Sequence, residues 1–540
     1  MKDISSTGSF INFYLNNYIY VDKTKYIRDL IKLERVFISR PRRFGKSLTL
    51  DTIATLFETG VEPYFKGTWI YDKWTEPTYP VLRLNFLNLD NFSIDDFKNK
   101  LNSYITEFAN KIGVKEYAEK KEPEDSIDSM LEKLREEKRQ IVILIDEYDY
   151  QLTSNINHDD LYKQFQQKIK RFYANIKDKL AIKFLGITGV TRLKDVEIFS
   201  IGSDINDITN ESAFSQLIGF TRDEIKKYYI DYLKLAASYE NKCRVEEVTD
   251  AQIESMLDMM AQNYDGYCFD EDYEKKVFNT WSVNKFFQTM VGKKKVQFGE
   301  YWYDNGGLPS ILVNYLKTHE LNIFEYLDKD KFLKVSSDDF KNPTALTTIN
   351  QNVLMCQTGY LTLRSDLNKT STVALGIPNG EIYKALNRLL ANNIFKGNTD
   401  ITDDYGRSLL EVGTVDDIIN LFNSALNSVS YDNYPIVSES SVQNMLKLYL
   451  LGAHQKVLSE VHEAKGRADL VVNTDNRRIV FEFKYAKNET EAKTKLSEAV
   501  EQIKTRDYGN ILPKKAELIR IAAVFNADPK VRAFTEFQLV

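Results

Sequence analysis

Residues 40–47, Arg-Pro-Arg-Arg-Phe-Gly-Lys-Ser, combine residue types that bind phosphate groups. They follow the apolar residues 36–38 and precede apolar residues at helical spacing, so a strand should end and a helix should begin here. Backbone N–H groups at the start of such a helix face phosphate oxygens, a lysine reaches the terminal phosphates, and a hydroxyl holds Mg²⁺. The last two roles fall to Lys46 and Ser47. We therefore expect these loop residues to bind ATP, with Ser47 also a metal ligand: Arg42, Arg43, Phe44, Gly45, Lys46 and Ser47.

The loop departs from the usual phosphate-loop pattern at its first position. The pattern G-x-x-x-x-G-K-[ST] requires glycine at position 40, where this chain has Arg40. Arg40, Arg42 and Arg43 either replace the cradle that glycine would provide or face a partner. The alternative for the whole loop is an ordinary strand-to-helix turn with exposed arginines. The substitution also leaves open whether bound ATP is hydrolysed.

A second set of candidate residues follows two apolar runs. Residues 141–145 are consecutively apolar and lead into Asp146 and Glu147, as in a central parallel strand whose carboxyl end carries acid. A phosphate-loop enzyme needs one carboxylate near Mg²⁺ and another to polarise the attacking water, and we assign these roles to Asp146 and Glu147. Thr188, at the end of the next run, would contact the γ-phosphate or the water, and Arg192 would stabilise charge. The alternatives are a strand that enters a solvated loop and, for Arg192, an ordinary surface arginine.

Acidic and basic residues near the end of the chain form a second chemical centre. Asp469 starts one predicted strand, and the next carries Glu482 and Lys484 on one face and Phe481 and Phe483 on the other. If the two strands pair as a hairpin, the polar side chains converge. They then supply carboxylates for Mg²⁺ and a cation to orient the water, as phosphodiester hydrolysis requires. We expect Asp469 and Glu482 to bind the metal. The alternative is a solvent-facing strand with a cross-strand salt bridge.

Four motifs resemble those of a known family. Residues 20–24 (Tyr-Val-Asp-Lys-Thr), 39–47, 146–149 (Asp-Glu-Tyr-Asp) and 188–191 (Thr-Gly-Val-Thr) are similar to AAA-ATPase-like proteins that carry a C-terminal PD-(D/E)XK nuclease-like domain. In that family the arginine-rich loop is itself the signature, so the missing glycine is a family feature. The resemblance covers most of the chain and implies an ATP-binding hydrolase.

At the second centre the resemblance also implies roles for single residues. Three residues match the signature positions of the PD-(D/E)XK pattern: Asp469, Glu482 and Lys484. Gln502 lies on the following predicted helix, where related nuclease-like domains often hold a glutamine directed at the site. Either Glu439 or Glu460 is the further upstream acid, and the sequence does not choose between them.

The order of predicted elements indicates an α/β fold. Strands and helices alternate up to about residue 190, which is the rhythm of a doubly wound parallel sheet. We predict these domains: a phosphate-loop, AAA-like domain (1–220), a helical lid (221–345), a small α/β or winged-helix-like module (346–431) and a restriction-endonuclease-like domain (432–540). The last has αβββαβ order if a strand lies near residues 455–461.

The composition is that of an ordinary globular protein. Hydrophobic residues make up 43% of the chain and charged residues 28%. A chain of 540 residues is too long to fold around one hydrophobic core. Neither a membrane-spanning run nor a signal-peptide pattern is found, so we expect a cytoplasmic protein. The three cysteines have no metal-knuckle spacing. The net charge of −6 argues against a protein that coats nucleic acid, although a local basic groove can still bind DNA.

These features predict an ATPase coupled to an Mg²⁺-dependent nuclease-like domain that acts on DNA. In this hypothesis ATP gates the nuclease by moving the helical lid or by assembling protomers into a homo-oligomer. The competing hypothesis is a nucleotide-dependent switch or scaffold whose nuclease fold only binds a partner. A kinase or small-molecule phosphotransferase would leave Asp469, Glu482 and Lys484 unexplained.

Overall fold

The structure is a computed structural model. It describes residues 1–540 except 91, 194–203, 303–309, 317–318, 320–322, 344, 396–404, 454, 464–465 and 510–515, and except the side chains of 310, 405, 456, 459, 460, 462 and 463. The chain divides into two compact units. Unit 1 comprises Met1–His319 and Phe332–Ile382, and unit 2 comprises Glu320–Lys331 and Tyr383–Val540.

A five-stranded parallel sheet lies at the centre of the first part of unit 1. Its spatial order is β2-β3-β4-β1-β5. The strands are β1 (Arg35–Ser39), β2 (Val81–Asn85), β3 (Ile141–Asp146), β4 (Ile182–Gly189) and β5 (Asn206–Asp207). The strands of this sheet pair in parallel, so the carboxyl ends of β1, β3 and β4 meet at one edge. The sheet therefore places the predicted loop and the predicted acids side by side.

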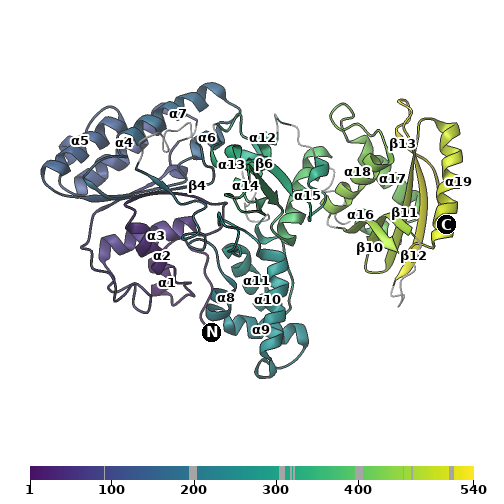
Figure 1. Cartoon of the computed structure of the whole chain (residues 1–540), viewed down its shortest axis with the longest axis horizontal. Helices are drawn as coiled ribbons and strands as arrows, with labels where there is room; N and C mark the ends of the chain where they lie inside the picture. The colour runs from purple at the N-terminus through teal and green to yellow at the C-terminus, as the bar shows by residue number, and fades with distance from the viewer. Residues whose placement is uncertain are drawn as a thin grey trace. The chain divides into compact units, whose positions relative to one another are not determined.

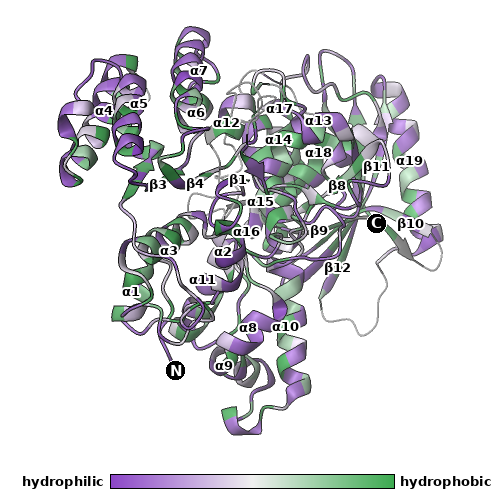
Figure 2. Ribbon diagram, turned by 60° about the vertical axis from the view of Figure 1, so that its left-hand side comes forward, coloured by the Kyte–Doolittle hydropathy of each residue, from purple (hydrophilic) through white to green (hydrophobic). Residues whose placement is uncertain are grey.

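Helices cover both faces of this sheet. Helices α4, α5 and α7 lie on one side of β4, and α1, α2 and α3 lie on the other (Figure 1). The helices of this part are α1 (Phe10–Leu15), α2 (Thr24–Ile31), α3 (Lys46–Thr59), α4 (Ile94–Lys111), α5 (Pro123–Glu136), α6 (Tyr150–Ser154) and α7 (Asp159–Ala174). In Figure 2, β3 and β4 have hydrophobic colours while α4 and α7 are largely hydrophilic, as expected for strands buried on both faces. The doubly wound fold is confirmed.

A helical region follows the sheet. It contains α8 (Arg222–Tyr228), α9 (Ile230–Asn241), α10 (Asp250–Tyr264), α11 (Thr280–Lys293) and α12 (Ser310–Leu316). A capping box starts α8, because the Thr221 side chain accepts from the Glu224 N–H and the Glu224 side chain accepts from the Thr221 N–H. Ile19 and Val21 from the N-terminal arm join the buried core of these helices. The arm therefore connects the phosphate-loop part to the helical part.

A small three-stranded sheet completes unit 1. Its order is β6-β8-β7, with β6 (Leu333–Ser336), β7 (Thr362–Leu363) and β8 (Thr372–Gly376). Helices α13 (Ser337–Lys341) and α14 (Gln351–Gln357) lie between these strands in sequence. Since β6 precedes residue 346 and pairs with β8, the sheet crosses the predicted boundary at 345. The four-domain division stays a prediction.

Unit 2 contains a mixed five-stranded sheet of order β13-β12-β11-β10-β9. Its main elements are α18 (Glu439–Gly452), β9 (Lys456–Glu463), β10 (Gly466–Asn473), β11 (Arg477–Ala486), α19 (Glu489–Arg506), β12 (Glu517–Asn526) and β13 (Ala533–Leu539). Preceding them are α15 (Gly380–Ile394), which starts in unit 1, α16 (Tyr405–Val412) and α17 (Val415–Asn427). The antiparallel hairpin β10–β11 and the αβββαβ order are confirmed, and β13 adds an antiparallel edge strand.

Among the residues described, no helix has both the length and the apolar character that crossing a bilayer requires.

Candidate functional sites

The loop between β1 and α3 has an unusual backbone. Arg43 and Gly45 both have positive φ, at 69° and 106°, and α3 begins directly after Gly45. This conformation is strained for residues with a β-carbon, and it turns the backbone sharply before the helix N-terminus. Such a turn directs N–H groups toward one concave side, where an anion binds.

Lys46 lies inside this loop. Its ammonium donates to the carbonyl oxygens of Arg40 and Pro41, at 3.0 and 3.3 Å, and lies 3.8 Å from a carboxylate oxygen of Glu147. Only 4% of its surface is exposed. The ammonium therefore already stands at the centre of the loop, held by weak acceptors that a phosphate oxygen can replace.

Asp146 connects the loop helix to the sheet edge. Its two carboxylate oxygens accept hydrogen bonds from the Ser47 and Thr188 hydroxyls, each at 2.6 Å. These three residues come from α3, β3 and β4, and the parallel register brings their strand ends together. One carboxylate and two hydroxyls form an oxygen-rich group that suits a hydrated Mg²⁺.

Glu147 stands beside this group. Its backbone has a positive φ of 54°, and it lines the same cavity as Lys46. Burial raises the pKa of Glu147, while the positive charges of Lys46 and Arg42 act in the opposite direction. A partly buried carboxylate next to cations is suited to accept a proton from water.

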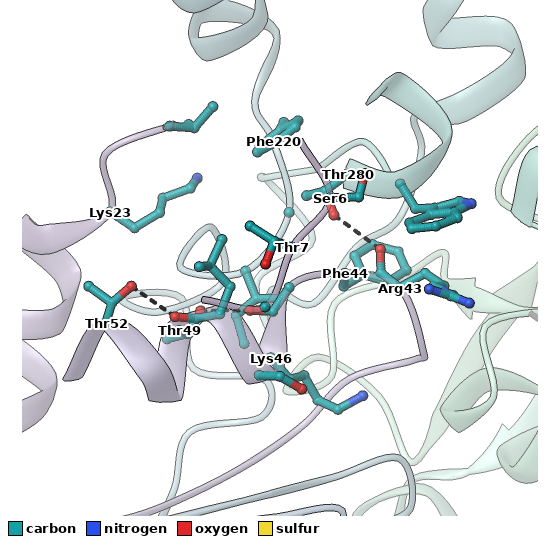
Figure 3. Close-up of a pocket in the computed structure, with 18 of the residues that line it drawn as sticks. Ser6, Thr7, Lys23, Arg43, Phe44, Lys46, Thr49, Thr52, Phe220 and Thr280 are labelled. Carbon is teal, nitrogen blue, oxygen red and sulfur yellow. Dashed lines mark hydrogen bonds between the residues drawn. The ribbon is translucent and has the colours of Figure 1, made fainter. Parts of the chain in front are cut away.

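A cavity of about 500 Å³ opens on the loop. Figure 3 shows Lys46 and Phe44 together with Lys23, Thr49 and Phe220 around it. Its walls come from the N-terminal arm, the phosphate loop, the first turn of α3 and the helical region; the lining includes residues 5–8, 42–49 and 217–220, and Thr280, Trp281 and Asn284. This volume is in the range of ligand pockets for drug-sized molecules.

Of the three loop arginines, Arg40 does not face this cavity. It is 1% exposed, lies 4.2 Å from the Phe269 ring centroid and donates to the Ser39 and Thr209 carbonyl oxygens. Burial lowers its pKa to about 9, although the nearby Asp207 raises it. Arg40 therefore stabilises the loop through buried contacts on the side away from the cavity, and it does not replace the glycine as a phosphate contact.

The other two arginines stay near the cavity. Arg42 lines it. Arg43 stacks on Trp281 at 4.1 Å, and its carbonyl oxygen accepts from the Thr280 hydroxyl at 3.0 Å (Figure 3). The helical region thus holds the loop through the N-terminus of α11.

Arg192 is not brought together with the loop cavity. Its side chain forms an ion pair with Asp207 and donates to the Lys341 carbonyl oxygen. It lines a separate small cavity with Arg40, Cys268 and Cys356. Its role in charge stabilisation stays a prediction that this arrangement does not favour.

The sequence interpretation missed the contributions of the N-terminal arm and of α11. The Phe10 N–H donates to Asp51 on α3 at 2.6 Å, and Asn284 on α11 donates to the Ser5 carbonyl oxygen at 3.2 Å. The Asn279 side chain accepts from the Ser282 N–H and so caps α11. Asparagine is a preferred helix cap, so Asn279 could have indicated that Thr280 and Trp281 lie at the start of a helix.

Replacing Gly45 by alanine should destabilise unit 1, because alanine pays about 1–2 kcal/mol in the left-handed region. We expect a fall of a few degrees in the thermal unfolding midpoint, measured by circular dichroism. Gly292→Ala is the matched control, since Gly292 has open space around it and lies in α11, where alanine stabilises by up to about 1 kcal/mol. Equal unfolding midpoints for the two variants would contradict the assigned loop strain.

The second candidate site lies on the β10–β11 hairpin of unit 2. The Lys484 ammonium is 2.8 Å from Glu482, 3.4 Å from Glu439 and 3.1 Å from the Phe483 carbonyl oxygen. A carboxylate oxygen of Asp469 accepts from the Phe483 N–H at 2.8 Å. The hairpin therefore brings Asp469, Glu482 and Lys484 together, while the rings of Phe481 and Phe483 stack on the other face at 5.6 Å.

Glu482 is the most deeply buried of these groups, at 1% exposure. Burial and then the charge of Asp469 raise its pKa to about 7, although Lys484 lowers it. Its Oε2 atom has no hydrogen-bond partner among the described residues. A buried carboxylate oxygen without a partner, within electrostatic reach of a second carboxylate, fits a divalent cation.

The metal donor set is small. Over the described part of the chain, no group of three or more His, Cys, Asp or Glu residues is close enough to hold a metal. Asp469 and Glu482 would therefore share Mg²⁺ with water, which is how Mg²⁺ is often held in proteins. Glu439 contacts Lys484, whereas the Glu460 side chain lies outside the described residues.

Gln502 lies on α19, away from direct contact with the carboxylates. Its amide donates to the Tyr508 hydroxyl at 3.4 Å, and Arg506 donates to the same hydroxyl at 2.7 Å. Sequence reasoning did not single out Arg506 or Tyr508. Arg506 follows Gln502 by four residues and Tyr508 follows it by six. Residues four apart lie on the same face of a helix, so this spacing could have indicated that Arg506 lies beside Gln502.

Comparison with known proteins supports two domains. Residues 5–199 match the family described as predicted AAA-ATPase, and residues 437–535 match the PD-(D/E)XK nuclease superfamily. The chain thus carries an AAA-ATPase-like domain and a C-terminal PD-(D/E)XK nuclease superfamily domain, as the resemblance predicted. A related sequence is the "Uncharacterized protein in vnfD 5′region" of Azotobacter chroococcum mcd 1, which is 25% identical over 528 residues, covering 95% of this chain and 94% of the relative.

Comparison with solved structures gives two matches of low identity. Cdc6p from Pyrobaculum aerophilum is 11% identical with a TM-score of 0.22, and covers 68% of this chain and 92% of its own. The Orc1 protein of Aeropyrum pernix, solved in complex with DNA, is 11% identical with a TM-score of 0.25, and covers 69% and 95%. Neither score is high enough to support an argument about this chain.

Proposed function

We propose that unit 1 binds and hydrolyses ATP with Mg²⁺ and that unit 2 hydrolyses phosphodiester bonds in DNA with Mg²⁺. The observation that carries this proposal is that each unit gathers the partners of its reaction around one buried carboxylate. Asp146 holds the hydroxyls of Ser47 and Thr188, and Glu482 lies against Lys484.

In unit 1, Lys46 would exchange its carbonyl partners for the β- and γ-phosphates, while Ser47 and Asp146 hold Mg²⁺. Thr188 would orient the water or the γ-phosphate. Glu147 would accept a proton as the water oxygen bonds to the γ-phosphorus and the bond to the β–γ bridging oxygen breaks. The products are ADP and inorganic phosphate.

In unit 2, Asp469 and Glu482 would hold Mg²⁺, which when bound acidifies a water and offsets charge on the phosphate. Lys484, held by Glu482, would orient the attacking water. The water oxygen bonds to phosphorus, the bond from phosphorus to the leaving sugar oxygen breaks, and that oxygen takes up a proton. One water is consumed for each bond cleaved.

ATP would control the nuclease. The helical region contacts the phosphate loop through Thr280 and Trp281, so a bound nucleotide can change its position. We propose that this change, or assembly of several protomers, allows cleavage.

The test is cleavage of a panel of labelled DNA substrates, single-stranded and duplex, with Mg²⁺ in the presence and absence of ATP. We expect cleavage that stops when a chelator removes Mg²⁺ and returns when Mg²⁺ is restored in excess, because carboxylates without metal cannot activate water. Cleavage that continues in excess chelator would contradict the metal assignment, and no cleavage of any substrate would contradict the nuclease assignment.

A nucleotide-dependent switch or scaffold is the second candidate function. Arg40 in place of glycine and the bonds from Lys46 to the loop carbonyls favour slow turnover. Titration with labelled ATP, with and without DNA, separates the two. Tight binding without turnover or stimulation by DNA would support the switch, whereas DNA-stimulated release of phosphate would support the enzyme.

A further inference from the structure

Arg506 is a second cation beside the nuclease-like site. It is the last residue of α19, and its guanidinium donates to the Tyr508 hydroxyl at 2.7 Å. Tyr508 is fully buried in a core with Ala468 and Val480 from the hairpin. The Tyr508 hydroxyl also accepts from Gln502 at 3.4 Å. The guanidinium is thus anchored from one side by a rigid residue.

Gly466 leaves room for the Arg506 side chain. A β-carbon placed on Gly466 would lie 2.5 Å from Cδ of Arg506 and 3.2 Å from a ring carbon of Tyr508. Gly466 is the first residue of β10, and Asp469 follows three residues later on the same strand. The stem of Arg506 therefore crosses the start of the strand that carries a proposed metal ligand.

The two site carboxylates lie within electrostatic reach of Arg506. The Tyr508 hydroxyl, and then the charges of Glu482 and Asp469, raise the pKa of the Arg506 guanidinium. In the part of the chain that the structure describes, however, it forms no ion pair with a carboxylate, and it is partly exposed. Lys484 differs, because it contacts Glu482, Glu439 and the Phe483 carbonyl oxygen. Arg506 therefore keeps N–H donors that no described carboxylate occupies.

We propose that Arg506 binds a phosphate group of the nucleic-acid substrate next to the carboxylates of unit 2. This inference rests on the proposed nuclease function. A guanidinium presents N–H groups in a planar fork that matches two phosphate oxygens, and the Tyr508 hydroxyl fixes its orientation. Lys484 would act on the water and Arg506 on the phosphate.

The test compares Arg506→Met with Arg506→Lys and with Lys504→Met. Lys504 is exposed on the same helix, so its variant removes the same charge without touching the site. For Arg506→Met we expect kcat/KM for DNA cleavage to fall about 100-fold, because a charge-assisted phosphate contact is lost. Arg506→Lys should recover part of this loss, and Lys504→Met should remain near the wild type at the same salt concentration.

Two further measurements separate phosphate binding from a structural role. Affinity for a fluorescein-labelled DNA duplex and for its single strand, measured by anisotropy in Ca²⁺, should fall in Arg506→Met. Mg²⁺ affinity measured by calorimetry should not fall, and the variant should remain folded by circular dichroism. Weaker metal binding with unchanged DNA affinity would overturn the proposal in favour of a residue that only positions the carboxylates.

The failure of this inference differs from the failure of the proposed function. Wild-type protein that cleaves no DNA would contradict the nuclease function, while the anisotropy comparison would still decide the role of Arg506. Cleavage that is lost in Glu482→Gln but unchanged in Arg506→Met would support the nuclease function and overturn the assignment of Arg506.

Discussion

Lys46→Ala is expected to lower ATP turnover by about 100-fold or more, because the variant loses the only loop side chain whose ammonium can move onto the terminal phosphates. In the structure this ammonium is 4% exposed and bonds to the Arg40 and Pro41 carbonyl oxygens. Calorimetric titration with a non-hydrolysable ATP analogue and a phosphate-release assay measure binding and turnover separately. We expect both to be weakened.

The same substitution removes a donor from two buried carbonyl oxygens, which costs about 1–3 kcal/mol. Loss of activity must therefore be separated from loss of fold. Lys25→Ala is a suitable control, since Lys25 is exposed on α2. The unfolding midpoint of nucleotide-free Lys46→Ala tests for a folding defect. A folded Lys46→Ala variant that turns over ATP like the wild type would overturn the phosphate-loop assignment.

The sequence was sufficient to predict the sheet and its acidic edge. Residues 141–145 form a continuous apolar run, and such runs are typical of parallel strands buried on both faces. Once β1 and β3 belong to one parallel sheet, the contact of Ser47 with Asp146 follows, because Asp146 ends β3 and Ser47 lies in the first turn of the helix after β1, at the same edge. The hairpin that unites Asp469 with Glu482 and Lys484 was predictable for a similar reason, since its two strands are adjacent in sequence.

The orientation of the loop arginines was not predictable. Arg40 stacks on Phe269, a residue more than two hundred positions later, and no local pattern indicates that contact. An arginine is rarely buried unless other groups satisfy it, so a sequence-based prediction exposes it. In this protein, tertiary contacts with Phe269 and with backbone carbonyl oxygens keep Arg40 buried.

The residues that line the two sites also could not be predicted from local sequence patterns. Residues 5–8 and Trp281 line the cavity at the phosphate loop although they are far apart in sequence. Arg506 reaches Gly466 across forty positions. Periodicity predicts which face of an element is apolar, but it carries no information about which distant element covers that face.

Glu482→Gln is expected to lower DNA cleavage by about 1000-fold while ATP hydrolysis continues, since losing a metal-binding carboxylate removes about 4 kcal/mol of transition-state stabilisation. The amide has the same shape and carries no charge. The domain should stay folded, because Oε2 of Glu482 has no partner to lose and Lys484 keeps its contact with Glu439. Cleavage of labelled DNA and release of phosphate from ATP are measured on one preparation.

Glu517→Gln provides the matched control for this substitution. Glu517 is an exposed carboxylate on the neighbouring β12, paired with Arg477, and its loss should leave both activities unchanged. Because Lys46 and Glu482 belong to different units, Glu482→Gln should lower cleavage alone, whereas Lys46→Ala should lower ATP turnover and, through the proposed control by ATP, cleavage as well. Loss of ATP hydrolysis in Glu482→Gln would show that the sites are coupled in both directions. Undiminished cleavage by Glu482→Gln would overturn the assignment of Glu482 to the cleavage site.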